Sequence, residues 1–401
     1  MKKSEQISEF YIQRMEQQVN EINADILKEI GQRVRLIGTM NTTQAMQVVS
    51  MMEYGESYEN IRNKLYRLTH KSYADIDRMF DEIAKENQYF AKQFYEYRGM
   101  PFIPFEQNEG LKSYVRGFAN TAKNNYTKMM NSNVLGYGLM NADGSYQFMG
   151  IKDTMNYVVD KAVMAITQGK ATFDQEMRST LKQLGGSGLR VISGRTYIDK
   201  DGNVRNHSRR LDSTLRMYML DSTRDFANNM QLKFGEEYGA DGVEITVHEN
   251  PAPDHAPIQG KQFTLKEFVD IQAGEYGRAI GQYNCYHGIL NIVMGVSKPQ
   301  YTDEELQEII DRNEKGFELD GKHYTMYQGT QMQRKIETAI RQQKDTQIVA
   351  RASNNKELIA ESQRKITKLN NQYKVLCEES GLIPKKNRAS VSGYRRVKVW
   401  R

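Results

Sequence analysis

The central fold is decided by residues 211–248, which end in Lys233-Phe-Gly-Glu-Glu-Tyr238-Gly-Ala-Asp-Gly242-Val-Glu-Ile-Thr-Val-His248. Apolar side chains recur broadly on one side of 211–238, which predicts a long helix. Gly239 is suited to end that helix, because glycine tolerates the left-handed conformation common after a helix C-terminus. Residues 243–248 then alternate between apolar and polar side chains, as in a half-buried strand. The stretch therefore predicts an α+β unit in the middle of the chain.

The residues before this unit are mostly helical in pattern. Ile22, Ile26 and Ile30 lie at helical spacing in the first hundred residues. We expect a turn at 69–71 and helices over 22–37, 42–52, 57–68, 72–86, 111–130, 155–168 and 173–184. Gly185-Gly-Ser-Gly188 is interpreted as a flexible link. Two hairpins are expected, one pairing 134–140 with 145–149 around Asp143-Gly144, and one over 196–205.

The residues after the unit return to helix. Thr302-Asp-Glu-Glu305 has the pattern of a capping box and predicts a helix to residue 313. A small hairpin is expected at Asp320-Gly321. The charged stretches 324–350 and 355–379 carry a narrow apolar stripe, which predicts a helical hairpin or coiled coil.

The expected fold class is mainly α with a smaller α+β unit. We divide the chain into a helical N-terminal region (1–100), a helical region with a hairpin (101–190), an α+β domain with short hairpins (191–300), a charged helical C-terminal region (301–384) and a basic tail (385–401).

Composition limits the class of protein. The 401 residues are enough for two or three domains, and a charged fraction of 26% is typical of a soluble protein. No stretch approaches the roughly 20 apolar residues that span a bilayer, so no membrane partner is expected. The amino terminus lacks a signal-peptide pattern, and two cysteines are too few for a disulfide framework. We therefore expect synthesis in a cytoplasm.

Positive charge is concentrated at the C-terminal end. Residues 321–401 hold 18 Lys and Arg against 6 Asp and Glu, and the basic tail has no acidic residue. Its cations are Lys385, Lys386, Arg388, Arg395, Arg396, Lys398 and Arg401. Together with Tyr394 and Trp400 they suit contact with the phosphates and bases of DNA. The alternatives are a solvated tail, or one that binds an acidic protein surface. The tail has too few apolar residues for us to expect it in the core.

Two short polar segments flank the α+β unit. They are His248-Glu-Asn-Pro-Ala-Pro-Asp254-His255-Ala-Pro-Ile-Gln-Gly260-Lys261-Gln-Phe263 and Tyr283-Asn284-Cys285-Tyr286-His287-Gly288. They hold three of the six histidines and one of the two cysteines. Since one segment follows the predicted strand and the other precedes the next apolar run, the two can meet in space.

Three interpretations of these segments stay open. A thiolate and three imidazoles, from His248, His255, Cys285 and His287, could bind a metal ion, although the paired spacing of zinc motifs is absent. Alternatively, Cys285 and His255 could form a nucleophile pair with Asp254 or Asn284 orienting the imidazole. We favour a structural polar cluster that braces rigid turns, without metal or other cofactor. Its members would be His248, Asp254, His255, Gly260, Asn284, Cys285 and His287.

The chain resembles the tailed-phage minor capsid family related to the Mu F-like head-morphogenesis proteins. The resemblance rests on Arg209-Arg-Leu-Asp212, Leu-Asp221-Ser-Thr-Arg224, Gly242-Val-Glu-Ile-Thr-Val-His248, His255 with Gly260-Lys261-Gln-Phe263, Asn284-Cys285-Tyr-His287, Tyr301-Thr-Asp-Glu-Glu and the helical stretch 331–341. It spans nearly the whole chain and is most specific over 190–300.

The resemblance implies a function. It implies a low-copy structural protein of the virion, in the capsid interior or at the portal vertex, that assists head assembly and DNA packaging or ejection. The implied partners are the portal or major capsid protein and double-stranded DNA, and no enzymatic activity is implied. The alternative function is a metal- or thiol-dependent hydrolase or nuclease built on His255, Cys285 and His287.

Overall fold

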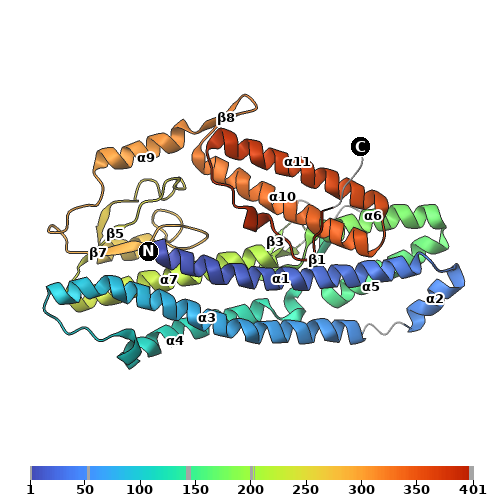
Figure 1. The fold of residues 1–401 in the computed structure, drawn as a ribbon, viewed down its shortest axis with the longest axis horizontal. Coiled ribbons are helices and arrows are strands. Elements are labelled where there is room, and N and C mark those ends of the chain that lie inside the picture. Colours follow the sequence, from blue (N-terminus) through green and yellow to red (C-terminus); the bar gives the residue numbers. More distant parts are fainter. Residues whose placement is uncertain (1, 52–54, 141–145, 199–201, 203, 397–401) are drawn as a thin grey trace.

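The computed structural model describes residues 2–51, 55–140, 146–198, 202 and 204–396. These residues form an elongated body of long helices, with small antiparallel sheets set against it (Figure 1). The predicted fold class, mainly α with a smaller α+β part, is confirmed. No helix of the described chain is long and apolar enough to cross a bilayer.

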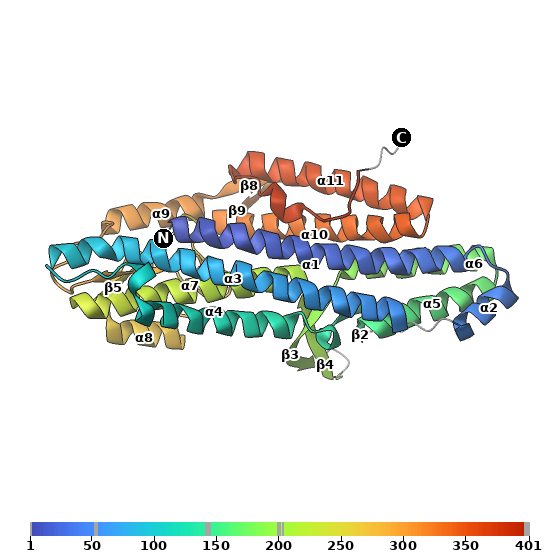
Figure 2. The same ribbon diagram turned by 60° about the horizontal axis from the view of Figure 1, so that its bottom comes forward.

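Four long helices run along the body side by side, as Figures 1 and 2 show. They are α1 (Lys2–Ile37), α3 (Gly55–Tyr97), α4 (Glu109–Met129) and α7 (Leu211–Tyr238). Two shorter helices, α2 (Thr42–Met51) and α5 (Ile151–Thr167), lie toward one end. The main hydrophobic core is continuous through all six helices, because each contributes fully buried apolar side chains to one cluster.

Helix α3 corrects a prediction. The turn expected at 69–71 does not exist, and these residues, His70 among them, lie within the helix. No glycine or proline interrupts the helix after Gly55. The hydroxyls of Thr69 and Ser72 donate to carbonyl oxygens four residues earlier, at 2.8 and 2.9 Å. The Ser72 hydroxyl also lies 2.8 Å from the Gln18 Oε1 atom of α1, so it joins two helices at the position where the sequence predicted a new helix to begin.

The first sheet lies near the middle of the body. Its strands β1 (Leu135–Met140), β2 (Tyr146–Gly150), β3 (Arg190–Ile198) and β4 (Val204–Arg210) pair antiparallel in the order β2-β1-β3-β4. Both predicted hairpins are therefore confirmed as strand pairs. The expected turn at 143–144 lies outside the described residues.

Helix α6 (Lys170–Ser187) corrects a second prediction. Residues 185–187, expected in a flexible link, continue the helix, and Gly188 ends it with φ of 60°. A Cβ atom at position 185 would lie 2.3 Å from the Cα of Thr346. Gly185 is thus needed for a close approach of two helices, because no side chain fits between the backbones.

The C-terminal helices were predicted closely. Helix α9 (Asp303–Lys315) begins with the expected capping box of Thr302 and Glu305. Strands β8 (Phe317–Leu319) and β9 (Lys322–Tyr324) form the small hairpin. Helices α10 (Met326–Ala352) and α11 (Lys356–Ser380) form the expected helical hairpin, and α10 packs on α1 and α6.

A buried ion cluster fixes α10 against the start of α7. The Arg210 guanidinium lies 3.1 Å from Asp212 and 2.9 Å from Asp345, and Arg341 lies 3.1 Å from Asp212. Burial opposes ionisation of Asp212, but the two guanidiniums outweigh it and hold its pKa well below the usual range. Among the described residues, only Arg210 lies within salt-bridge distance of Asp345, and burial raises the pKa of Asp345 to about 6.

The C-terminal segment, defined here as residues 385–396, folds back onto this surface. It begins with a short 3-10 helix, Lys386–Ala389, whose carbonyls accept hydrogen bonds from Arg341 and Lys344. Val391 is 9% exposed and belongs to the main core. The expectation that the tail lies wholly outside the core was therefore wrong for this segment.

A second sheet forms the α+β part. Strands β5 (Gly242–Ile245), β6 (Gln262–Thr264) and β7 (Ile289–Ile292) pair antiparallel in the order β6-β5-β7. Helix α8 (Leu265–Ala273), which was not predicted, covers a separate small core. The strand expected over 243–248 ends at Ile245. Two loops, 246–261 and 274–288, leave this sheet and carry the polar segments.

Candidate functional site

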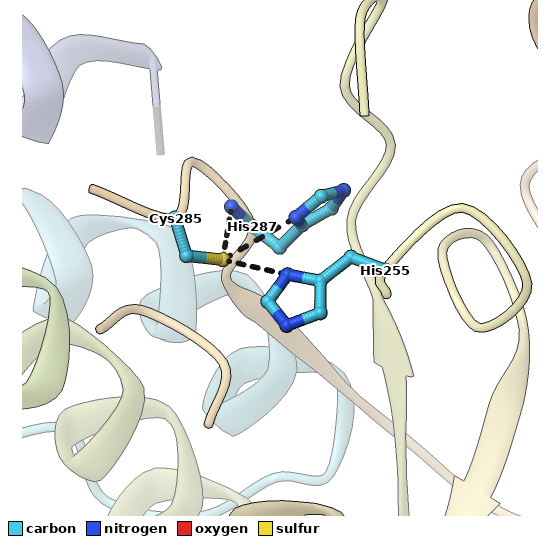
Figure 3. A group of neighbouring side chains, drawn as sticks. All are labelled: His255, Cys285 and His287. Atoms are coloured by element: carbon cyan, nitrogen blue, oxygen red, sulfur yellow. Dashed lines mark hydrogen bonds between the residues drawn. The ribbon is translucent and has the colours of Figure 1, made fainter. Parts of the chain in front are cut away.

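The two polar loops bring a cysteine and two histidines into contact. Figure 3 shows the Cys285 sulfur facing the Nδ1 atoms of His255 and His287, at 3.2 and 3.3 Å. The three residues are at most 3% exposed. Residues separated by 30 positions thus form one buried polar cluster.

The far ring nitrogens of both histidines are committed to carbonyl oxygens. His255 Nε2 donates to the backbone carbonyl of Arg278 at 2.8 Å, and His287 Nε2 donates to Gln259 Oε1 at 2.9 Å. Since a carbonyl oxygen can only accept, both Nε2 atoms carry protons. Each Nδ1 atom, when its ring is neutral, therefore directs a lone pair at the Cys285 sulfur.

Electrostatics favour the thiolate. Burial opposes ionisation of Cys285, but hydrogen bonds from His255 and His287 outweigh it and lower the pKa of the thiol to about 5. Burial likewise opposes protonation of His255, but its contacts with Cys285 and Arg278 raise the pKa of its imidazole. Without a metal ion, the cluster is thus suited to a thiolate–imidazolium pair.

His248 lies beside this cluster and outside it. Its Nδ1 atom accepts a hydrogen bond from the Asn250 amide at 3.1 Å, and its ring centroid is 6.0 Å from that of His287. Burial, with a smaller effect from His287, lowers the pKa of His248 to about 4. The four-residue metal set that the sequence left open as an alternative is therefore reduced to three in the described chain.

Asp254 and Asn284 do not orient the imidazole of His255. Asp254 makes two hydrogen bonds of 2.8 Å with the Arg278 guanidinium and stays 3.8 Å from His255 Nε2. Asn284 adopts a φ of 61°, and its amide donates to Asp221 of α7. The carbonyl of Arg278 takes the orienting position, so the nucleophile interpretation was wrong about its third member.

Gly260 has a steric role. Its φ is 71°, and its amide donates to Ile245 at the end of β5. A Cβ atom at this position would lie 2.3 Å from Leu306 of α9. A glycine is therefore required where the first loop returns to the sheet.

A pocket of about 570 Å³ opens beside the cluster. Cys285, His255 and His287 line it on one side, and residues of α10 and the C-terminal segment line the other. Across it, the guanidinium of Arg388 donates to the Tyr286 hydroxyl at 3.2 Å. Burial opposes ionisation of Tyr286, but Arg388 and other nearby cations outweigh it and lower the pKa of the phenol to about 7.

The predicted DNA-binding cations fall into three groups: exposed, largely buried, and outside the described residues. Lys385, Lys386, Arg395 and Arg396 are exposed. Arg388 is only 12% exposed and faces Tyr286 and Glu9. Lys398 and Arg401 lie outside the described residues. The structure thus leaves four described cations of the set open to a partner.

Sequence reasoning missed three residues of the site. Gln259 and Arg278 supply the acceptors for the histidines, and Asp221 receives the amides of Tyr283 and Asn284. Asp221 belongs to the motif Leu-Asp221-Ser-Thr-Arg224, which was singled out in the sequence. The sequence did not show that this part of α7 lies beside the loop of Tyr283 and Asn284. Arg278 binds His255 through its backbone carbonyl, and because every residue has a backbone carbonyl, the sequence gives no signal for this role.

A comparison with known protein families assigns nearly the whole chain to one family. A family model described as phage minor capsid protein 2 matches residues 5–378. No curated protein and no solved structure matches the chain. The match covers α1 through most of α11, and the resemblance inferred from the sequence is confirmed at the level of the phage minor capsid family. The chain belongs to the family of phage minor capsid protein 2.

Proposed function

We propose that this protein is a head-morphogenesis component of a tailed phage, related to the Mu F-like proteins and located at the portal vertex or inside the capsid. Family membership over residues 5–378 is the observation that carries the proposal, since it supports a structural role in the virion. In that role the protein binds the portal or the major capsid protein and assists assembly, packaging or ejection.

An exposed aromatic surface supports a protein partner. Near the end of α3, Tyr89 is 67% exposed, Phe90 43% and Tyr97 90%. Aromatic side chains are enriched at the centres of protein interfaces, where they bury a large apolar area. This end of the helical body is the contact surface that we propose for the portal or the major capsid protein.

The experiment is quantitative mass spectrometry of purified procapsids and mature heads. We expect the protein at low copy in both, and Tyr89→Ser with Tyr97→Ser should reduce its incorporation. Tyr66→Ser is the matched control, because Tyr66 is 64% exposed on the same helix but distant in sequence. Complete absence of the wild-type protein from both particles would overturn the proposal.

We also propose that double-stranded DNA contacts the basic C-terminal end. Lys385, Lys386, Arg395 and Arg396 are exposed on a segment that is fixed to the body, so their charges are held at a defined surface. Each neutralised phosphate of a duplex steepens the log–log salt dependence of binding by about 0.9. Four cations therefore account for a slope of about 3 to 4.

The test replaces all four with glutamine and measures duplex binding against salt. Deleting 385–401 is unsuitable, because it would also remove Val391 from the core. The matched control neutralises four exposed cations elsewhere: Arg67, Lys71, Lys152 and Lys266. The proposed contact predicts a flattened slope in the first variant alone. An unchanged slope there would favour an acidic protein surface as the partner.

A second candidate function is supported by the pocket that Cys285, His255 and His287 line. A buried thiolate beside a pocket could serve a thiol- or metal-dependent hydrolase or nuclease. Hydrolysis of DNA by the purified protein, abolished in Cys285→Ala, would support it. Equal inactivity of the two proteins in that assay would exclude the nuclease.

A further inference from the structure

We propose that Cys285, His255 and His287 bind one zinc ion, with the fourth coordination position facing the adjacent pocket. The proposal stands independently of the role in the capsid. It rests on the convergence of three ligand atoms, on the positions of the ring protons, and on the carbonyl groups that hold the two rings.

The ligand atoms have the separation that zinc requires. Zinc–sulfur and zinc–nitrogen bonds of about 2.3 and 2.0–2.1 Å at tetrahedral angles put sulfur and nitrogen about 3.5 Å apart. The Cys285 sulfur lies 3.2 and 3.3 Å from the two Nδ1 atoms, and all three ligand atoms lie within 4.8 Å of one another. An outward shift of a few tenths of an ångström brings both sulfur–nitrogen separations to the tetrahedral value.

The hydrogen-bond pattern leaves the centre short of protons. Both Nε2 protons are donated away from the sulfur, to Arg278 and Gln259. Two Nδ1 lone pairs then face one thiol, and the thiol has a single proton to donate. A cation at the centre satisfies all three groups at once, because thiolate and neutral imidazole are the forms that bind zinc.

The carbonyl groups behind the histidines match the surroundings of a bound metal. Histidine ligands of metals usually donate their second ring proton to a carboxylate or a carbonyl, which fixes the tautomer and the ring orientation. The backbone carbonyl of Arg278 and the side-chain carbonyl of Gln259 do this here at 2.8 and 2.9 Å. Both rings are therefore set with Nδ1 inward, as Figure 3 shows.

The fourth position follows from the same geometry. His248 does not fill it, because neither of its ring nitrogens lies within 4.8 Å of all three ligand atoms. Since all three ligand residues line the 570 Å³ pocket, the open position faces that space and is available to water. Three protein ligands and one exchangeable ligand are the usual composition of an open zinc site, whereas purely structural sites use four protein ligands.

The experiment measures metal in the purified full chain. We expect about one zinc per chain by mass spectrometry of the metal, as for a single mononuclear site. Cys285→Ser and His255→Ala should lower that content at least tenfold. Cys377→Ser and His248→Ala are the matched controls and should retain it, since Cys377 is the other buried cysteine and His248 is the neighbouring ring.

A second measurement tests the wild-type protein itself, so its main outcome does not depend on the folding of a variant. The wild-type protein is stripped of metal and titrated with cobalt(II), whose thiolate charge-transfer band reports coordination by sulfur. The band should appear in the wild type and in Cys377→Ser and be absent from Cys285→Ser. A wild-type protein with neither zinc nor the cobalt band would overturn the proposal. Retention of full zinc by Cys285→Ser and His255→Ala would overturn it as well.

Discussion

Replacing Arg388 with glutamine should raise the pKa of Tyr286. In the wild type, Arg388 hydrogen-bonds the phenol at 3.2 Å and, with Arg334 and Lys385, outweighs burial to bring the pKa to about 7. A neighbouring opposite charge typically shifts a pKa by about 1–3 units. We therefore expect the variant to titrate about 1–3 units higher, back toward the ordinary value.

The same shift makes stability depend on pH. The folded-state pKa lies below the ordinary value of 10.0, so the ionised phenol stabilises the folded chain. This contribution is fully present above the unfolded pKa and is lost as the pH falls through about 7. Between these limits the free energy of unfolding should rise with pH, by at most about 1.4 kcal/mol per unit. Because Arg388→Gln should raise the folded-state pKa of Tyr286, it should narrow the pH range over which the free energy of unfolding rises.

The assay is a spectrophotometric titration of tyrosinate, with urea unfolding at several pH values. One of the 24 tyrosines should ionise near neutral pH, and Tyr286→Phe should abolish that step. Arg396→Gln is the matched control, because Arg396 is exposed in the same segment. If no tyrosine of the folded wild type ionises below about pH 9, the docking of the C-terminal segment on Tyr286 is wrong.

Three further predictions concern packing, each measured as the free energy of unfolding in urea. Asp212→Asn should cost about 3–5 kcal/mol, because it removes the buried carboxylate that Arg210 and Arg341 share; a cost below about 1 kcal/mol would contradict the ion cluster. Gly185→Ala should cost about 1–3 kcal/mol through its clash with Thr346, whereas Gly186→Ala, with open space at its Cβ, should be harmless. Val391→Ala should cost about 1.6 kcal/mol for two buried carbons, and no loss would show that the C-terminal segment is undocked.

Local signals predicted the helices whose ends are set locally. The helix 211–238 was predicted to the residue, because Gly239 adopts the left-handed conformation that ends it. The capping box of Thr302 and Glu305 likewise fixed the start of α9. Both signals act within one helical turn, so they are legible without knowledge of the fold.

The wrong predictions occurred where a distant partner decides the local structure. Ser72 was expected to begin a new helix after a turn, yet its hydroxyl contacts Gln18 on α1, and the helix continues through it. Gly185 resembles a breaker, yet it allows close contact with Thr346. Val391 lies in a strongly basic tail, and it is buried because α10 binds the neighbouring carbonyls. Composition alone cannot reveal these partners.

The same distinction between local signals and distant partners applies to the candidate site. Cys285, His255 and His287 were identified because two rare residue types are dense in short segments. Their hydrogen-bond partners were not predicted, because Arg278, for example, contributes a backbone carbonyl that every residue possesses. His248 belongs to the same segment, but it accepts a local amide and stays outside the cluster of Cys285, His255 and His287.

The density of polar side chains in the two loops has a physical reason in the size of the α+β part. Its own core holds only seven buried apolar residues, and the loops 246–261 and 274–288 contain no helix or strand of their own. A core of that size stabilises little loop structure, and small units of this kind usually need disulfides, metals or anchored hydrogen bonds.

The loops here are held from outside, by Asp221 of α7 and by Leu306 of α9 packed against Gly260. They are held from inside by the contacts of Cys285 with two histidines. A zinc ion at that centre would act as the internal cross-link that the small core requires, so loss of the metal should loosen both loops before it affects the helical body.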